Sequence, residues 1–343
     1  MKKASKFVLI GALAGSLFAV GTTAAAQEKI VLRAADYVPP SHYLIRYVAK
    51  YWIDNVVKQS NGRIEIRHFP SEQLGKAKDM LSLTQSGVAD VAGVIPSFMS
   101  DRMPLSTISE LPGQYRSACH GTMATGELMM NNGILVKEEL DPNNVVVIFT
   151  VAVPPYILFS KRDRLASLED VKGLKIRTLG GVMTHTFEKL GAVGVQMALP
   201  EIYESLSRGT VDGIAYTYSS LLSSGFHKVV KSALVDVHFG GANFSYMMSK
   251  QRWNALPADM QKILLSVGQD TMKHACREMD KEAEEAKAKV KEAGVQFFDT
   301  PVADKAKLSK VMEEIAAEWV REGAKRGKPA DAVYKAFRAA LAR

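Results

Sequence analysis

The chain has 343 residues, 47% of them hydrophobic, which is enough for two domains with ordinary cores. Its formal net charge of +8 is spread along the sequence without a basic block, so it indicates an attraction for small anions rather than nucleic-acid binding. The sequence has no CxxC, HExxH, glycine-rich phosphate loop or G-x-S-x-G motif, which argues weakly against the common enzyme classes.

The first 26 residues have the pattern of a secretory signal peptide. Lysines precede an apolar stretch at residues 7–20, and Ala24-Ala25-Ala26 offers a cleavage site. The apolar stretch is short for a bilayer span, and no later segment is apolar and long enough. We therefore predict export to the periplasm with cleavage after Ala26. An uncleaved N-terminal anchor is the alternative.

The next part of the chain alternates strands and helices, as α/β domains do. Hydrophobic patterning predicts strands at 30–34, 63–69, 88–94 and 145–151, and helices at about 41–60 and through 80–85. Residues 131–141 are expected to be a polar connection. The alternation restarts at Pro154, with strands at 157–160, 174–177, 195–198, 213–216 and 234–237, and helices at 168–171, 184–190 and 200–208.

The restart predicts two similar lobes with a cleft between them. We expect lobe I at 27–153 and about 240–285, and lobe II at 154–239 and about 286–343. The last third is mostly helical, over 257–296, 307–323 and 330–342. A helix approaching 40 residues would be about 60 Å long, enough to cross both lobes.

The two cysteines, Cys119 and Cys276, lie far apart in helix-like contexts. An oxidising compartment permits a disulfide between them, but no spacing demands one. Between these alternatives the sequence favours two buried free thiols.

Arg177 is the main candidate for a ligand-binding residue. It ends a predicted strand at the edge where open α/β sheets bind ligands, and a guanidinium can hold a carboxylate through two parallel hydrogen bonds. A surface arginine or an interdomain ion pair is the alternative. Gly180 allows close backbone approach, and the strand after the Asp212-Gly213 turn is expected to bring Tyr216 and Tyr218 towards the same crevice. Further candidates are Tyr156, Tyr37, Pro96 and Leu199, with His42 and Tyr43 at the rim; any single tyrosine can instead be core.

The segment KGLKIR at 172–177, followed by EKLGAVGVQMALPEIYESLSRGTVDG at 188–213, resembles the substrate-binding subunits of tripartite ATP-independent periplasmic (TRAP) transporters, the DctP-like family. NGRIEI at 61–66, PSEQLG at 70–75 and LP at 256–257 extend the resemblance across the mature chain. It implies a two-lobed periplasmic binding protein fold with crossing strands and a long helix across both lobes. It also implies closure around an organic anion and delivery to membrane permease subunits. We expect a monomer without cofactor, metal or nucleic-acid partner.

The resemblance assigns Arg177 to the arginine that grips the substrate carboxylate. Many members have asparagine where this chain has Tyr216, and sialic-acid-binding members have a second arginine where it has Tyr156. Their acidic and basic first-lobe contacts fall near Pro96 and Met99. Metal-assisted 2-oxoacid members have an acid and a tryptophan after the Val-Asp-Gly turn. This chain has Ala215-Tyr216 there, which does not fit that pattern.

One cation among apolar, aromatic walls favours a small monocarboxylate with an apolar or aromatic body, because a sugar acid would leave hydroxyls unpaired. A sensor-coupled binding protein for the same ligands is the alternative. An exported enzyme on this scaffold is disfavoured, since the seven histidines have no ligand spacing.

Overall fold

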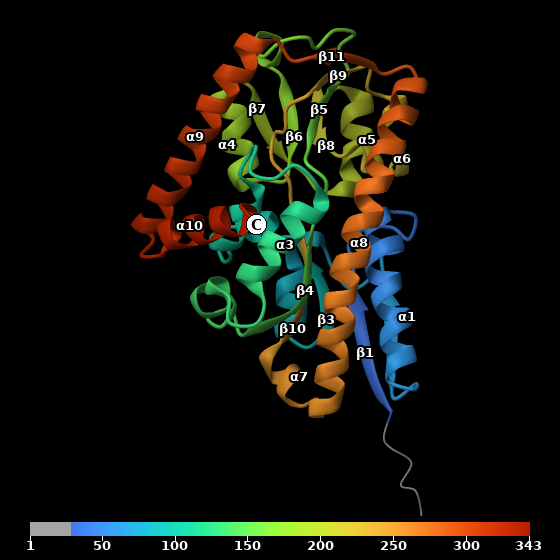
Figure 1. Cartoon of the computed structure of the whole chain (residues 1–343). Helices are drawn as coiled ribbons and strands as arrows, with labels where there is room; N and C mark the ends of the chain where they lie inside the picture. Colours follow the sequence, from blue (N-terminus) through green and yellow to red (C-terminus); the bar gives the residue numbers. More distant parts are fainter. Residues whose placement is uncertain (1–28) are drawn as a thin grey trace, which may run out of the picture.

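The structure, a computed structural model, describes residues 29–343 and contains two β-sheets placed one beyond the other (Figure 1). The predicted signal peptide lies outside the described residues. The first sheet has the order β2 (Ile64–Phe69), β1 (Ile30–Ala35), β3 (Val91–Val94), β10 (Asn243–Ser249) and β4 (Val145–Ala152). The second has the order β11 (Gln296–Asp299), β9 (Ser232–Val235), β5 (Ile157–Ser160), β8 (Gly213–Tyr216), β6 (Lys175–Thr178) and β7 (Val193–Gln196). We call the sheets, with the helices packed on them, lobe I and lobe II.

Helices cover both sheets. Those of lobe I are η1 (Leu44–Ala49, a π-helix), α1 (Lys50–Gln59), η2 (Ala77–Asp79), α2 (Met80–Gln85), η3 (Pro96–Met99), η4 (Leu105–Glu110), α3 (Ala118–Met129), η5 (Val136–Leu140) and α7 (Lys250–Asn254). Those of lobe II are η6 (Glu169–Val171), α4 (Gly181–Lys189), α5 (Leu199–Arg208), α6 (Tyr218–Ser223) and η7 (Phe226–Lys228). The two-lobed α/β fold expected from the sequence is confirmed, although η5 occupies part of the predicted polar connection at 131–141.

The chain crosses between the lobes at 153–156 and at 236–242, and the two crossings are hydrogen-bonded to each other. The Val153 amide donates to the Ala242 carbonyl (3.0 Å), and the Tyr156 amide donates to the Gly240 carbonyl (2.9 Å). From lobe I, the Tyr115 hydroxyl donates to the Val153 carbonyl (3.1 Å). Two hydrogen-bonded crossings between lobes are an arrangement suited to a hinge.

The long helix expected from the sequence is α8 (Ala258–Glu292), which spans about 52 Å at 1.5 Å per residue. It packs on α1, α3 and β4 of lobe I and on α6 of lobe II, so it runs along both lobes (Figure 1). It ends earlier than predicted because Gly294, at φ 96°, turns the chain into β11, which pairs with β9. In residues 29–343 no helix combines the length and apolarity of a membrane span.

Two C-terminal helices reach back across the hinge. The start of α9 (Val302–Lys325) is tied to lobe II, where Asp304 accepts from the Leu168 amide (2.8 Å), and α9 then packs on α4. The last helix, α10 (Ala330–Leu341), packs on α3 and η4 of lobe I. The lobe boundaries expected from the sequence remain a proposal. Because α10 packs on lobe I, we propose to assign α10 to lobe I rather than to lobe II.

The preference for two free thiols is wrong. Cys119 of α3 and Cys276 of α8 form a disulfide, with their Cα atoms 4.6 Å apart. Asp280, one turn further along α8, accepts from the Ala118 and Cys119 amides at the start of α3 (2.6 and 3.0 Å). This contact holds the two helix segments side by side, an arrangement that separation along the sequence does not reveal.

Candidate ligand-binding site

Arg177 lies in β6, between β7 and β8, and its side chain is only 2% exposed. Its Nε donates to the Met197 carbonyl (2.9 Å) in the loop that follows β7. Its Nη1 is buried and has no hydrogen-bond partner among residues 29–343. A buried guanidinium with an unpaired donor is costly unless an acceptor completes it, so this geometry suits an anion.

Three tyrosines named from the sequence surround this guanidinium. The Tyr216 ring, at the end of β8, lies under it, with the Arg177 Cζ 5.5 Å from the ring centroid. The Tyr156 ring meets Tyr216 edge-on at 6.0 Å. Tyr37, just after β1, reaches the group from lobe I: burial raises its pKa, as does Tyr216, while Arg177 opposes the rise. The structure therefore brings one cation and three phenols together between the lobes.

The other three candidates lie around this cluster. Pro96 begins η3 after β3, and its neighbour Phe98 packs edge-on against Tyr37 at 5.9 Å. Gly180 precedes α4 with φ 103°, and a Cβ there would meet the Gln196 side chain. Leu199 begins α5 and is buried. Pro96, Gly180 and Leu199 lie around the cluster of Arg177 and the tyrosines. The hydrogen bond to the Arg177 side chain comes instead from the Met197 carbonyl.

Tyr218 does not join the cluster, contrary to the sequence-based interpretation. It begins α6, where the Thr217 side chain accepts from the Ser220 amide (3.0 Å), and this helical turn points Tyr218 elsewhere. Its ring packs against Phe159 and Phe297, at 5.5 and 5.7 Å. Tyr218 is therefore part of the packing of lobe II.

Sequence reasoning missed the buried polar groups on the lobe I side of the cleft. Glu110, at the end of η4, is fully buried, and neither carboxyl oxygen has a hydrogen-bond partner within the described part of the chain. Burial raises its pKa to about 8, an effect that nearby Ser97 reduces. Nothing in the local sequence distinguishes Glu110 from an exposed acid. In the same residues, no group of three or more His, Cys, Asp or Glu side chains is placed to hold a metal.

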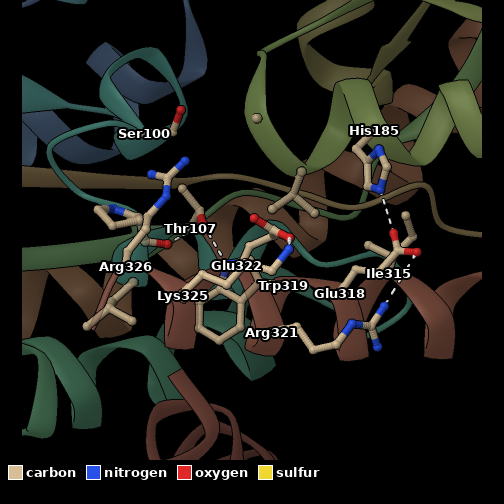
Figure 2. A pocket seen from close by; sticks show the side chains of 15 residues that line it. Ser100, Thr107, His185, Ile315, Glu318, Trp319, Arg321, Glu322, Lys325 and Arg326 are labelled. Carbon is tan, nitrogen blue, oxygen red and sulfur yellow. Dashed lines mark hydrogen bonds and ion pairs between the residues drawn. The ribbon is translucent and has the colours of Figure 1, made fainter. Parts of the chain in front are cut away.

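A separate groove of about 590 Å³ opens where η3, η4, α4 and α9 meet (Figure 2). Neither Arg177 nor the three tyrosines line it. Several of its charged side chains are paired with one another: Glu318 accepts from His185 (2.5 Å), and Glu322 accepts from Lys325 (2.6 Å). Trp319 donates to the Thr107 hydroxyl (2.9 Å) and so ties α9 to lobe I. We regard the groove as a joint between lobes rather than the ligand site.

The sequence profile of bacterial extracellular solute-binding protein family 7 (DctP) matches residues 34–322. The C4-dicarboxylate-binding periplasmic protein DctP of Rhodobacter capsulatus is 27% identical over 318 residues, which cover 90% of this chain and 92% of that protein.

Solved structures share the fold. A TRAP solute-binding protein from Rhodoferax ferrireducens, with copurified benzoate, has a TM-score of 0.84 and 24% identity, covering 92% of this chain and 98% of that one. A TRAP periplasmic solute-binding protein from Bordetella bronchiseptica, with bound mandelate, has a TM-score of 0.82 and 21% identity, covering 91% and 98%. At these identities the similarity establishes the fold.

Proposed function

Because the chain belongs to bacterial extracellular solute-binding protein family 7, the TRAP-type solute-binding proteins, we propose that it captures a small monocarboxylate with an apolar or aromatic body. Members of this family are periplasmic transport proteins, not enzymes, and they work with membrane permease components. In our proposal the lobes close around the ligand, Arg177 holds its carboxylate, and the loaded protein delivers it to the permease.

The observation that carries this proposal is the state of the Arg177 side chain. Its Nε is held by the Met197 carbonyl, so the planar group is oriented before a ligand arrives. Its buried Nη1 is left without a protein partner in the described residues. A carboxylate can supply the missing acceptor with charge-assisted hydrogen bonds, and lysine cannot reproduce the planar geometry.

The walls of the site support the choice of an apolar or aromatic body. Tyr37, Tyr156 and Tyr216 present rings whose faces and edges suit a flat ligand, with hydroxyls at their far ends. The bound benzoate and mandelate of two proteins with this fold are aromatic acids. Other proteins with the fold hold D-glucuronate or pyroglutamate, so the fold by itself does not select the ligand.

The proposal is tested by calorimetric titration of the mature protein with benzoate, mandelate, a branched aliphatic acid, succinate and glucuronate. We expect an aromatic or branched monocarboxylate to bind most tightly. Replacing Arg177 by Ala should weaken binding by at least tenfold, because a hydrogen bond to a charged group contributes about 1.5–3 kcal/mol. Arg177→Lys should also lose affinity.

The matched control is Arg208→Ala, because Arg208 is an exposed lobe II arginine on α5 that pairs only with Glu204 in the structure (3.1 Å). Its affinity should equal that of the unmodified protein. Equal binding by the Arg177→Ala protein would remove Arg177 from the site. Tight binding of glucuronate alone would refute the ligand class.

A further inference from the structure

His42 connects the two lobes through a buried polar contact. It lies in the turn between β1 and η1 of lobe I and is only 3% exposed. Its Nε2 is 3.3 Å from the Ser220 hydroxyl, in α6 of lobe II. The contact therefore exists only while the two lobes are close together.

The neighbouring backbone determines which ring nitrogen of His42 carries the proton. The Leu44 amide donates to Nδ1 (3.3 Å), and an amide N–H cannot accept, so Nδ1 must be the unprotonated nitrogen. Nε2 then carries the hydrogen and donates to the Ser220 hydroxyl. Protonation of Nδ1 would place two donors face to face and leave the Leu44 amide without its acceptor.

The surroundings of His42 also disfavour a charged ring. Tyr43 stacks on it at a centroid distance of 4.5 Å, and Arg46 lies one helical turn further on in η1. Glu282 of α8 is the nearby acid, but it binds Arg46 through both oxygens (2.8 Å each). Burial, and then Arg46, lower the pKa of His42 to about 3.

The contact adjoins the proposed ligand site. Hydrogen bonding to Ser220 affects the pKa of both Tyr43 and Tyr216, which places this hydroxyl next to both phenols. Tyr216 in turn lies against the Arg177 guanidinium. Only Tyr216 therefore lies between the His42–Ser220 contact and the Arg177 guanidinium.

We propose that His42 is an acid-sensitive latch: its neutral ring holds the lobes closed over the ligand, and protonation releases them. The inference rests on the proposed function, since it assumes that closure retains the ligand. When the lobes open, His42 gains access to water and recovers an ordinary pKa near 6.5. The closed form then binds fewer protons than the open form, so acid favours opening and ligand release.

The test compares benzoate affinity at pH 7.5 and pH 5.0. For the unmodified protein we expect a loss of about fifteenfold, which follows from an open-state pKa near 6.5, a closed form that requires the neutral ring, and equal populations of the open and closed forms at pH 7.5 without ligand. His42→Gln, which cannot titrate, should bind with nearly the same affinity at both pH values. Any change in the ionisation of benzoate itself is shared by the two proteins and cancels in the comparison.

The matched control is His274→Gln, which should keep the full pH dependence because His274 is a half-buried histidine of α8 that stacks on Tyr51 of α1, within lobe I. An affinity that does not change with pH in the unmodified protein, or an equal loss in His42→Gln, would overturn the latch while leaving the proposed function intact. If benzoate binds at neither pH, the proposed ligand class fails instead.

A second measurement tests the latch in the ligand-free protein, through the distance between the lobes. Spin labels at Lys58→Cys in lobe I and Glu204→Cys in lobe II, both exposed positions, report the distance between the lobes. We expect this distance to increase between pH 7.5 and pH 5.0, and the increase to be absent with His42→Gln. A distance independent of pH, or an equal increase in both proteins, would overturn the proposal.

Discussion

Arg177 and Glu110 are both buried at the junction of the lobes, but a buried charge has different consequences at the two positions. The buried Nη1 of Arg177 has no hydrogen-bond partner among residues 29–343, which creates a demand for an acceptor. A carboxyl group has another option, because it can take up a proton and become neutral. Glu110, with its pKa raised to about 8 by burial, is in this protonated state at neutral pH.

The protonation of Glu110 predicts a particular pH dependence of stability. Its folded pKa lies above the ordinary value of 4.5, so the folded protein holds one more proton than the unfolded chain between these two pH values. The stabilisation is complete below about pH 4.5 and is lost as the pH rises towards 8. As the pH rises through this window, the titration of Glu110 should lower the free energy of unfolding by up to about 1.4 kcal/mol for each pH unit.

Urea unfolding at pH 5.5 and pH 8 measures this effect. Glu110→Gln keeps the shape of the side chain but cannot titrate, so its stability should fall less over this range than that of the unmodified protein. Identical pH profiles for the two proteins would show that Glu110 is ionised when folded, or that water reaches it.

At the scale of elements, α3 and α8 are joined in three ways within lobe I. The Cys119–Cys276 disulfide links them covalently, Asp280 accepts from two amides at the start of α3, and both helices pack on β4. A cross-link between residues 157 apart in sequence removes much of the freedom of the unfolded chain. It does not cross the hinge, so its contribution should concern stability rather than closure.

Replacing both cysteines by serine should therefore lower the free energy of unfolding by about 2–4 kcal/mol. The affinity for a ligand, measured well below the melting temperature, should change little. Chemical denaturation of the oxidised protein, the reduced protein and the double variant measures the first effect, and calorimetry measures the second. A large loss of affinity in a variant that remains folded would instead connect this helix pair to closure.

For the whole molecule, the proposed closure would depend on the elements that touch both lobes. Among them are the paired crossings at 153–156 and 236–242, the long helix α8, and the strap formed by α9 and α10 (Figure 1). The strap is anchored to lobe II at Asp304 and to lobe I through α10. Between these anchors, Trp319 donates to Thr107 of η4 at the edge of the groove (Figure 2).

The Trp319–Thr107 hydrogen bond should contribute about 1 kcal/mol to the closed form, an ordinary value for a neutral pair. Trp319→Phe and Thr107→Val should then each lower ligand affinity by roughly fivefold, and the double variant by little more than either one. Calorimetric titration of the four proteins gives the coupling energy. Strictly additive losses would mean that the bond plays no part in closure.

The alternation of strands and helices, the restart at Pro154 and the 35-residue helix α8 were predictable because each leaves a local periodic signal. Arg177 was predictable as a candidate because it lies near the carboxyl end of a strand, where open α/β sheets bind ligands. The family resemblance in its segment agrees with the profile match over 34–322. Its carboxylate contact remains a proposal.

Only the tertiary structure decided the remaining features, because they depend on residues far apart in sequence. Strand β10 gave no clear periodic signal, since it is buried on both sides between β3 and β4. The disulfide required α3 to lie beside α8, and Tyr218 packs against Phe297, which is far away in the sequence. The contact between His42 and Ser220 joins residues 178 apart in sequence, and a contact at that separation has no local pattern to announce it.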